Sequence, residues 1–275
     1  MNDITALILT YNEAPNIVRN LRALGWIPRV IIIDSFSTDA TLEIAKLAHP
    51  NVTVVQRPFD THATQWNFGL EQITTPWVLS LDADYEVSAE LALEMQNTEP
   101  TQNVAGYVAA FRYLIYGRPL RASVYPERTV LFRTGAARYF DDGHTQRLKV
   151  EGDVQKLHGP IYHDDRKPLS RWIGAQDRYA MIEATHLLSM PRERLSLQDK
   201  LRLKVFCAPF IMPIYLLFAK RLILDGWPGW FYVLQRTIAE MLLSLRLLIE
   251  RQKLASGSAS ATARREDGGR EPRKS

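Results

Sequence analysis

Cysteine is nearly absent from this chain of 275 residues, where Cys207 stands alone. A single thiol excludes an intramolecular disulfide framework and a cysteine-rich zinc site, and it suits a reducing compartment. Residues 1–5 (MNDIT) lack the basic stretch of a signal peptide and lead directly into an apolar run. We therefore expect a protein that works on the cytoplasmic side of the membrane.

Long hydrophobic runs are missing as well. The uncharged apolar stretch at 205–219 contains Pro209 and Pro213 and is shorter than the roughly twenty residues that a membrane-spanning helix needs. Residues 200–254 carry nine Lys+Arg against three Asp+Glu, whereas residues 1–199 carry 20 against 24. An apolar, basic segment of this kind is typical of a helix that lies in the plane of an anionic membrane. The alternative is a pair of helices packed on the catalytic core.

Composition and patterning predict three regions. The hydrophobic fraction of 46% and the charged fraction of 23% are ordinary for a globular enzyme. We expect a folded domain at 1–199, whose pattern changes near residue 100, and then the membrane-associating segment (200–254). A polar, Arg-rich tail at 255–275 is predicted to be disordered. No nucleic-acid-binding module is recognisable, so nucleic acid is not an expected partner.

The first hundred residues alternate between apolar runs and helical spacing. The runs at 4–10, 30–33, 52–55 and 77–81 predict buried strands, and the intervening segments predict helices. This order predicts an α/β fold with a parallel, doubly wound sheet. Further on, we expect strands at 105–116, 129–133 and 154–162, a loop at 141–144, and a helix from Ser170 towards His186.

Two carboxylates follow the run at 77–81. Asp82 and Asp84 are two positions apart, so in an extended chain both face one side at the carboxyl end of the strand. Mg²⁺ and Mn²⁺ prefer oxygen ligands, and Mg²⁺ commonly takes one or two carboxylates together with substrate phosphates. The pair therefore fits a clamp for the pyrophosphate of an activated nucleotide, with a solvated surface turn as the alternative reading.

Four motifs fall at predicted strand ends in order along the chain. They are residues 10–13 (TYNE), 34–41 (DSFSTDAT), 65–70 (QWNFGL) and 81–84 (LDAD). The set resembles the family-2 glycosyltransferases, which are inverting enzymes of the GT-A fold. The later chain, including residues 125–128 (YPER) and 143–144 (GH), resembles the bacterial subgroup that adds glucose to the lipopolysaccharide core.

This resemblance implies that residues 1–199 are the catalytic domain, with a nucleotide-sugar half (1–100) and an acceptor half (101–199). It also implies roles for particular residues. The turn at Thr10, Tyr11, Asn12 and Glu13 would line the uridine of a UDP-sugar, and Asp34 would accept a hydrogen bond from the uracil ring. In the same way Asn67 would reach the nucleotide-sugar, Asp82 would touch ribose or metal, and Asp84 would be the main ligand of Mg²⁺ or Mn²⁺. Asn12 and Asp39 have a second reading as turn or helix-cap residues.

Inversion requires a general base that takes the proton of the acceptor hydroxyl. The family resemblance places a Glu in a loop after the D-x-D, but here Thr145 stands at that position. Asp142 is the first candidate for the base, Asp141 the second and His144 the third, with a simple turn as the alternative. His163 is a candidate to complete the metal sphere, although a lone His is often structural.

The sequence thus predicts an inverting, metal-dependent transfer of a hexose from a UDP-sugar onto a lipid-linked or lipopolysaccharide glycan. The expected location is the cytoplasmic face of the bacterial inner membrane, as a peripheral protein. A nucleotidyltransferase is one alternative, but the turn after the first run has no Gly-rich loop for a triphosphate. A non-catalytic membrane scaffold that keeps the sugar-nucleotide fold is the other alternative.

Overall fold

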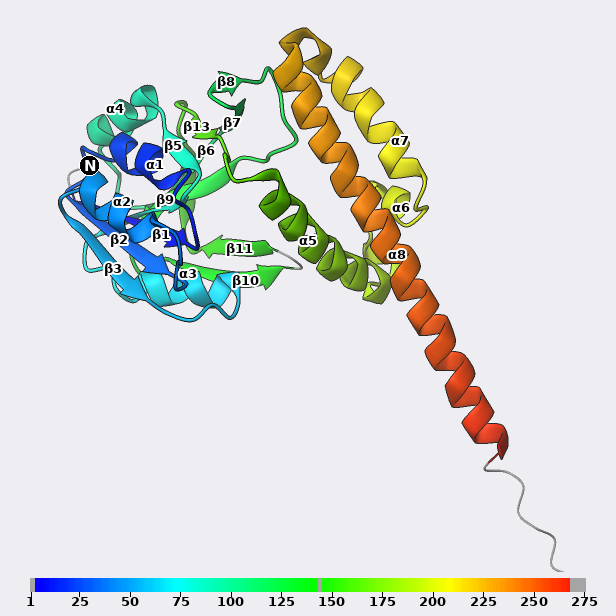
Figure 1. Ribbon diagram of the computed structural model, residues 1–275. Helices are drawn as coiled ribbons and strands as arrows, with labels where there is room; N and C mark the ends of the chain where they lie inside the picture. Colours follow the sequence, from blue (N-terminus) through cyan, green and yellow to red (C-terminus); the bar gives the residue numbers. More distant parts are fainter. Residues whose placement is uncertain (1–2, 143–144, 268–275) are drawn as a thin grey trace, which may run out of the picture. The chain divides into compact units, whose positions relative to one another are not determined.

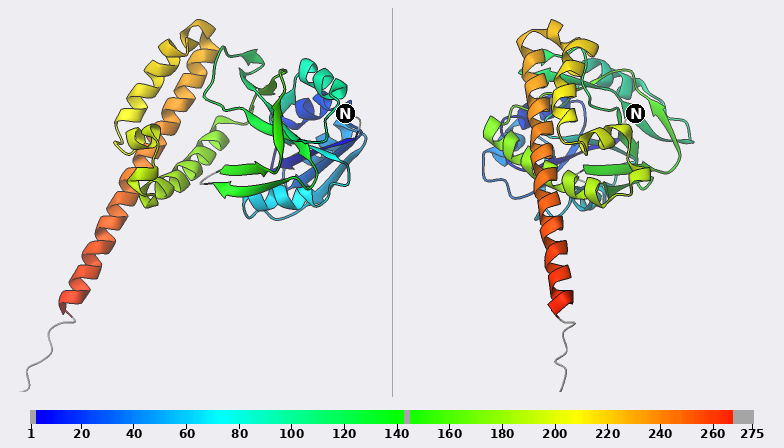
Figure 2. Two further views of the ribbon diagram at one scale, coloured as in Figure 1. Left: turned by 180° about the vertical axis from the view of Figure 1, so that it is seen from behind. Right: turned by 90° about the vertical axis from the view of Figure 1, so that its right-hand side faces the viewer.

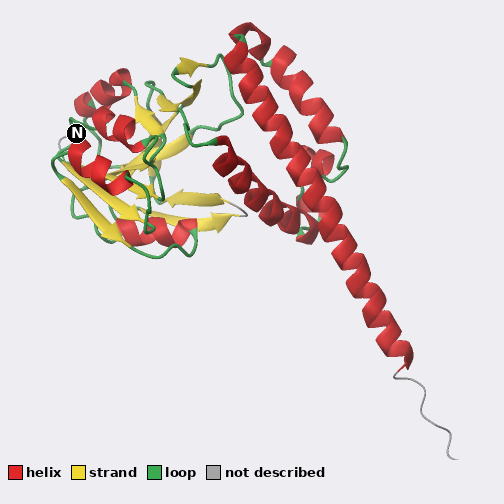
Figure 3. Cartoon of the chain, viewed as in Figure 1, coloured by secondary structure: helices red, strands yellow, loops and turns green. Residues whose placement is uncertain are grey.

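The computed structural model describes residues 3–142 and 145–267. The chain packs as two compact units, one formed by Met1–Leu169 and Lys220–Phe231, the other by Ser170–Ala219 and Tyr232–Ser275. Figure 3 shows that the strands lie in the first unit and that the second is helical. The first unit is the mostly parallel α/β fold that the sequence predicts.

The elements of the first unit alternate as expected up to residue 97 (Figure 1). They are β1 (Ile4–Thr10), α1 (Ile17–Ala23), β2 (Arg29–Asp34), α2 (Thr41–Ala48), β3 (Val52–Gln56), α3 (His62–Leu70), β4 (Trp77–Asp82), β5 (Tyr85–Val87) and α4 (Ala89–Asn97). The later elements are β6 (Val104–Ala109), β7 (Phe111–Ile115), β8 (Arg118–Pro119), β9 (Arg128–Arg133), β10 (Ala137–Asp142), β11 (Thr145–Val150), β12 (Asp153–Lys156), β13 (Ile161–His163) and η3 (Leu222–Asp225).

The central sheet has seven strands in the order β12-β6-β9-β4-β1-β2-β3. Strands β4, β1, β2 and β3 are parallel, whereas β9 runs antiparallel to both β4 and β6. The near-continuous apolar sequences of β1, β2 and β4 fit this position, because inner parallel strands are covered on both faces. Two small sheets, β10-β11 and β5-β13-β7-β8, complete the unit.

Alternate residues of the central strands pack into two separate hydrophobic cores. Ile4, Ala6 and Ile8 of β1 pack in a cluster with the buried faces of α1, α2 and α4. Leu7, between them in sequence, packs in the opposite cluster with Trp66 of α3 and with the hairpin strand β10. The sheet is therefore sandwiched between helices α1, α2 and α4 on one face and α3 with the β10-β11 hairpin on the other.

Three predicted elements of the acceptor half differ from the structure. The run at 105–116 divides at Ala110 because β6 pairs in the central sheet while β7 pairs with β13. The run at 154–162 divides into β12 and β13, since Pro160 between them has no N–H for a strand ladder. The segment 141–144, predicted to be a loop, contributes Asp141 and Asp142 to strand β10 of an antiparallel hairpin.

The second unit is built from helices whose apolar faces meet each other. Its elements are α5 (Leu169–Ser189), η1 (Arg192–Arg194), α6 (Leu197–Arg202), α7 (Cys207–Ile214), the π-helical turn η2 (Tyr215–Ala219) and most of α8 (Trp227–Asp267). Ala184 and Leu187 of α5 pack with Leu243 and Leu247 of α8. Arg202 forms a fork of two bonds to Glu240, of 2.7 and 3.2 Å, which ties α6 to α8.

Two predicted boundaries shift in this unit. Helix α5, which the sequence assigns to the catalytic domain, belongs to the helical unit. Helix α7 runs beside the first half of α8 (Figure 2). Helix α8 continues to Asp267, so residues 255–267, predicted to be disordered, are helical. Extending an existing helix requires no new nucleation, and four alanines in that stretch favour it. Among the described residues, no helix has the length and hydropathy needed to cross a membrane.

Candidate active site

The carboxyl ends of β1, β2 and β4 meet at one edge of the central sheet. The strand register pairs Thr10 with Asp34 and Leu9 with Asp82. Parallel strands that end together bring the segments after them side by side, which is where open α/β sheets bind ligands. The motifs at 10–13, 34–41 and 81–84 therefore surround one region of the first unit.

Asp34 is fully buried at this edge, and its carboxylate is surrounded by donors. Oδ1 accepts from Thr10 Oγ1 at 2.8 Å and from Ser37 Oγ at 2.5 Å, and Oδ2 accepts from Ser37 N at 2.9 Å and Gln56 Nε2 at 3.2 Å. A carboxylate has about four acceptor positions. Asp34 therefore orders the loop after β2, and a contact with a uracil ring would require one of these bonds to be exchanged.

Asn12 joins the turn after β1 to the loop after β2. Its backbone lies in the left-handed region, with φ of 55°, which asparagine tolerates better than most residues. Asn12 Oδ1 accepts from Thr38 N at 2.6 Å, and Asn12 N donates to Ser37 Oγ at 2.7 Å. The turn reading of Asn12 thus holds in the structure. Tyr11, beside it, is 52% exposed on the outer side of the turn.

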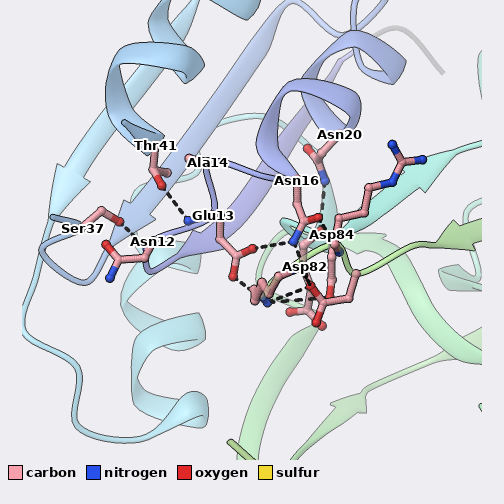
Figure 4. Close-up of polar contacts among 12 residues, drawn as sticks. Asn12, Glu13, Ala14, Asn16, Asn20, Ser37, Thr41, Asp82 and Asp84 are labelled. Atoms are coloured by element: carbon pink, nitrogen blue, oxygen red, sulfur yellow. Dashed lines mark hydrogen bonds and ion pairs between the residues drawn. The ribbon is translucent and has the colours of Figure 1, made fainter. Parts of the chain in front are cut away.

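Asp39 and Thr41 extend the same connection. The Asp39 carboxylate accepts from Ala14 N at 3.3 Å and from Thr41 N at 3.0 Å, the latter at the first residue of α2. Thr41 Oγ1 in turn accepts from Glu13 N at 2.6 Å. Figure 4 shows two of the links between the segments, from Asn12 N to Ser37 Oγ and from Glu13 N to Thr41 Oγ1. The N-cap position of α2 is Ala40, so Asp39 acts as a turn residue that ties the start of α2 to the turn after β1.

A lysine that the sequence did not single out lies among the acids of this region. The Nζ atom of Lys167 is 2.9 Å from Glu13, 3.6 Å from Asp165 and 4.0 Å from Asp84. Asn16 donates from Nδ2 to Glu13 at 3.0 Å and to Asp165 at 3.1 Å, as Figure 4 illustrates for its bond to Glu13. We name Glu13, Asp84, His163, Asp165 and Lys167 the Lys167 cluster.

His163 joins this cluster from the end of β13. Its Nε2 lies 3.2 Å from Asp84 Oδ2, and the two side chains are 12% and 13% exposed. The imidazole packs against the rings of Tyr113 and Tyr125, at centroid distances of 4.6 and 4.9 Å. The structure thus brings together Asp84 and His163, two of the three residues predicted as metal ligands.

Burial and charge act in opposite directions on the titrating groups of the cluster. Burial raises the pKa of Glu13 to about 7, although the neighbouring Lys167 lowers it. Burial alone would also raise the pKa of Asp84, but the positive charges of His163 and Lys167 hold that pKa below its usual range. Burial alone would lower the pKa of Lys167, but the negative charges of Asp84 and Glu13 have the larger effect. The pKa of the ammonium is therefore raised.

Asp82 is not a member of the ion pairs found in this group among the described residues. It is the last residue of β4, whereas Asp84 lies in the turn before β5, so the two acids do not continue one extended strand. Burial raises the pKa of Tyr125, and the negative charge of Asp82 raises it further. Asn20 donates to the main-chain carbonyl of Asp82 at 3.0 Å and to that of Tyr85 at 2.8 Å, which fixes the turn (Figure 4).

The donor set fits a divalent cation whose coordination the substrate completes. Within residues 3–142 and 145–267, no three His, Cys, Asp or Glu side chains gather closely enough to enclose a metal by themselves. Asp84 supplies one oxygen and His163 one nitrogen, and these two atoms lie 3.2 Å apart. Mg²⁺ usually binds proteins through one or two carboxylates plus substrate phosphates, and carboxylate oxygens also suit Mn²⁺.

Asn67 and Asp141 serve the β10-β11 hairpin in the structure. Asn67 Nδ2 donates to Tyr139 O at 2.9 Å, and Tyr139 N donates to Asn67 Oδ1 at 3.0 Å. These two bonds use both ends of the amide, so Asn67 attaches α3 to β10 and is not gathered with the Lys167 cluster. Asp141 Oδ1 accepts from Ala63 N at 3.3 Å, in the first turn of α3.

The first base candidate, Asp142, ends strand β10, where its backbone pairs with Thr145. The side chains of Asp142 and Thr145 and all of His144 lie outside the described residues. The described part of the hairpin therefore places Asp141 and Asp142 on a strand that is attached to α3 through Asn67 and Asp141.

The sequence analysis missed Lys167, Asp165 and Asn16. Asn16 and Asp165 are 149 positions apart, and no local pattern connects them. The available signal was weak: a run of charged residues, 164–167 (DDRK), directly after the His163 candidate.

The matches to known proteins differ in how much of the chain they cover. Residues 5–149 match the family model described as glycosyl transferase family 2. An uncharacterized glycosyltransferase of Rickettsia prowazekii is 34% identical over 208 residues, which cover 70% of each protein. The match to an uncharacterized glycosyltransferase of Rickettsia felis, 34% identical, spans 40% of this chain and 38% of that relative.

Two further similarities concern named activities. The lipopolysaccharide core biosynthesis glycosyltransferase LpsC of Rhizobium meliloti is 25% identical over 189 residues, covering 66% of this chain and 70% of LpsC. A mannosyltransferase of Pyrobaculum calidifontis, solved with GDP-Man and Mn²⁺, matches with a TM-score of 0.50 at 16% identity. That match covers 91% of this chain and 87% of the mannosyltransferase.

The fold and the site define a glycosyltransferase of the GT-A type, with a mostly parallel sheet flanked by helices and acids at its carboxyl edge. The chain belongs to glycosyl transferase family 2. Both conclusions confirm the resemblance found in the sequence.

Proposed function

We propose that this chain transfers a hexose from a UDP-sugar onto a hydroxyl of a lipid-linked or lipopolysaccharide glycan, with inversion at the anomeric carbon. The observation that carries the proposal is the pair of Asp84 and His163, which lie 3.2 Å apart at the carboxyl edge of the sheet. The similarity to LpsC supports the acceptor class. The mannosyltransferase solved with Mn²⁺ supports a divalent cation, and its GDP-Man makes guanine the alternative base.

Asp84 and His163 would hold the Mg²⁺ or Mn²⁺ ion, with the donor's diphosphate completing the coordination. When bound, the ion neutralises the negative charge that develops on the departing diphosphate. The turn at 11–13 and the loop at 37–39, joined through Asn12, form a rigid border on which a nucleoside can rest. Tyr11 offers an exposed ring there.

The β10-β11 hairpin would take the proton of the acceptor hydroxyl. As the acceptor oxygen forms its bond to the anomeric carbon, the bond from that carbon to the diphosphate oxygen breaks. The acceptor's proton passes to a carboxylate, for which Asp142 at the end of β10 remains our first candidate. Asp141 is less suited, because its Oδ1 already accepts from Ala63 N.

Donor turnover tests the proposal. We would incubate the purified full chain and Mn²⁺ with UDP-glucose, UDP-galactose, UDP-N-acetylglucosamine or GDP-mannose, and measure release of the nucleoside diphosphate with a lipid-extract acceptor. We expect release from one UDP-sugar, loss of activity with EDTA, and an inverted anomer by NMR. Consumption of a nucleoside triphosphate with pyrophosphate release would indicate the nucleotidyltransferase alternative. Binding of donors without any turnover would indicate the scaffold.

We also propose that the helical unit binds an anionic lipid surface, at the cytoplasmic face of the bacterial inner membrane. Four apolar side chains spaced four residues apart are 61–69% exposed along and beside α7: Phe206, Phe210, Ile214 and Phe218. The surrounding segment, 200–254, has an excess of basic residues. Buried apolar side chains and basic residues together favour binding to an anionic leaflet.

A further inference from the structure

Lys167 is held in the candidate donor site by acids from three separate parts of the chain. Glu13 follows β1, Asp84 follows β4, and Asp165 lies beyond β13. Its side chain is only 19% exposed, so the ammonium has lost most of its water. A buried cation is retained only where charged partners compensate for that loss, which these acids do.

The ammonium keeps hydrogen-bonding capacity in this position. It has three N–H donors, but of its three carboxylate distances only the 2.9 Å contact with Glu13 is of hydrogen-bond length. The contacts of 3.6 and 4.0 Å are electrostatic. Lysine binds phosphate as a compact point charge through such donors.

The position also relates Lys167 to the metal-ligand candidates. Its Nζ is 4.0 Å from Asp84 Oδ2, the same oxygen that lies 3.2 Å from His163 Nε2. A diphosphate that shares a cation with Asp84 would therefore come close to the ammonium. Two cations on one diphosphate stabilise the charge that builds up as the sugar leaves.

We propose that Lys167 binds the diphosphate of the nucleotide-sugar donor, with Glu13 and Asp165 holding the ammonium in place. This inference rests on the proposed function, since it assigns a second cation to the same donor site. It also gives Glu13 a positioning role, in place of the uridine contact that the family resemblance implies.

The test compares four forms of the full chain: wild type, Glu13→Gln, Lys167→Gln and the double variant. Affinities for UDP, GDP and uridine in Mn²⁺, and for Mn²⁺ alone, are measured by calorimetry. Lys167→Gln should weaken binding of the preferred nucleoside diphosphate by about tenfold to hundredfold, the range for a hydrogen bond to a charged group. Uridine should bind within about twofold of wild type, since it does not use the ammonium. Mn²⁺ alone should bind no more weakly than to wild type, because the variant removes a positive charge 4.0 Å from Asp84.

The double variant separates binding from a structural role. It removes both partners of the 2.9 Å ion pair and leaves neither charge unpaired. If Lys167 binds diphosphate, the double variant stays as weak as Lys167→Gln, whereas Glu13→Gln alone causes a smaller loss, because the ammonium is still present but is held by one partner fewer. Recovery of diphosphate affinity in the double variant would overturn the inference, because Lys167 would then only balance Glu13.

Lys46→Met is the control, since it removes an exposed lysine of α2 in the same unit. It should change no affinity. Equal weakening of diphosphate, uridine and Mn²⁺ by Lys167→Gln, with a lower Tm, would also overturn the inference. If wild type and Lys167→Gln bind the nucleoside diphosphate with equal affinity, only this inference is refuted. A wild type that binds neither UDP nor GDP refutes the proposed donor class, and the inference with it.

Discussion

Asp84 lies 3.2 Å from the His163 imidazole and 4.0 Å from the Lys167 ammonium, and its side chain is 13% exposed. An unpaired carboxylate would not be retained at that depth. Single residues of this site therefore have distinct tasks: Asp84 pairs with His163 and Lys167, Asp34 orders a loop, and Asn12 joins two segments. Substitutions should separate these tasks experimentally.

Asp84→Asn should abolish metal-dependent donor binding while the protein stays folded. The amide keeps the size of the side chain but loses its charge, so kcat/KM should fall by about 100-fold or more. The measurements are donor turnover and UDP affinity with and without Mn²⁺, with circular dichroism for the fold. Asp153→Asn, which neutralises an exposed acid of β12, is the control. Near-normal turnover of Asp84→Asn with Mn²⁺ would show that the metal-ligand assignment is wrong.

Asp142→Asn should leave donor affinity unchanged and lower kcat by about 100-fold or more, the usual effect of losing a general base. Asp141→Asn is the matched comparison, because it changes the neighbouring acid, whose Oδ1 accepts from Ala63 N. We expect that variant to affect mainly stability. If both variants lose kcat equally, or neither loses any, His144 becomes the candidate base.

Elements of the first unit depend on a few close approaches between main chains. A Cβ added at Gly159, just before β13, would lie 2.4 Å from Leu91 N and 2.5 Å from Leu91 Cα in α4. These are backbone atoms that cannot rotate away. The approach is reinforced by Glu94 of α4, whose carboxylate accepts from Gly159 N at 2.9 Å. The segment that leads to His163 is thus fixed against α4.

Gly159→Ala should lower the free energy of unfolding by about 1–3 kcal/mol, the usual cost of overpacking. It should also weaken Mn²⁺ binding, because His163 lies on the displaced strand. Thermal unfolding and calorimetry would measure both effects. Gly174→Ala is the control: its Cβ would meet only Arg178 Nη1 at 3.8 Å, and alanine favours the helix. An unchanged Tm for Gly159→Ala would contradict the tight contact.

How far the sequence predicts these elements depends on the range of the interactions. Strands β1, β2 and β4 were predictable because buried parallel strands leave a local apolar run. The β10-β11 hairpin was missed, although residues 142–143 (DG) between strand-like segments are a hairpin signal. Lys167 was not predictable, because its partners Glu13 and Asp84 are distant in sequence and only the folded sheet brings them together.

The whole molecule divides between an α/β unit and a helical unit, and the chain passes between them more than once. The helical unit holds its own apolar core and the buried Arg202–Glu240 pair. Its exposed apolar side chains at 206, 210, 214 and 218 are therefore not needed for that core. This separation allows the membrane proposal to be tested without altering the donor site.

The full-length protein should float with anionic vesicles, and Phe210→Ser with Phe218→Ser should abolish this. Each phenylalanine contributes about 1.5–3 kcal/mol when fully buried in lipid. The assay is liposome flotation with phosphatidylcholine alone and with added phosphatidylglycerol. Leu47→Ser, which changes an 82% exposed leucine of α2, should bind as wild type does. A wild-type protein that stays unbound in both lipids would refute the proposal.

The segment Lys220–Phe231 returns from the helical unit to complete the first. Leu222 within it is fully buried, and Asp225 accepts from Arg121 Nε at 2.8 Å and from Arg121 N at 3.0 Å. During synthesis, the first unit therefore cannot reach its final packing when residue 169 leaves the ribosome. It must wait for another sixty or so residues, most of them in the helical unit. A nascent chain arrested before residue 220 should remain more sensitive to protease at Arg121 than one released after residue 231.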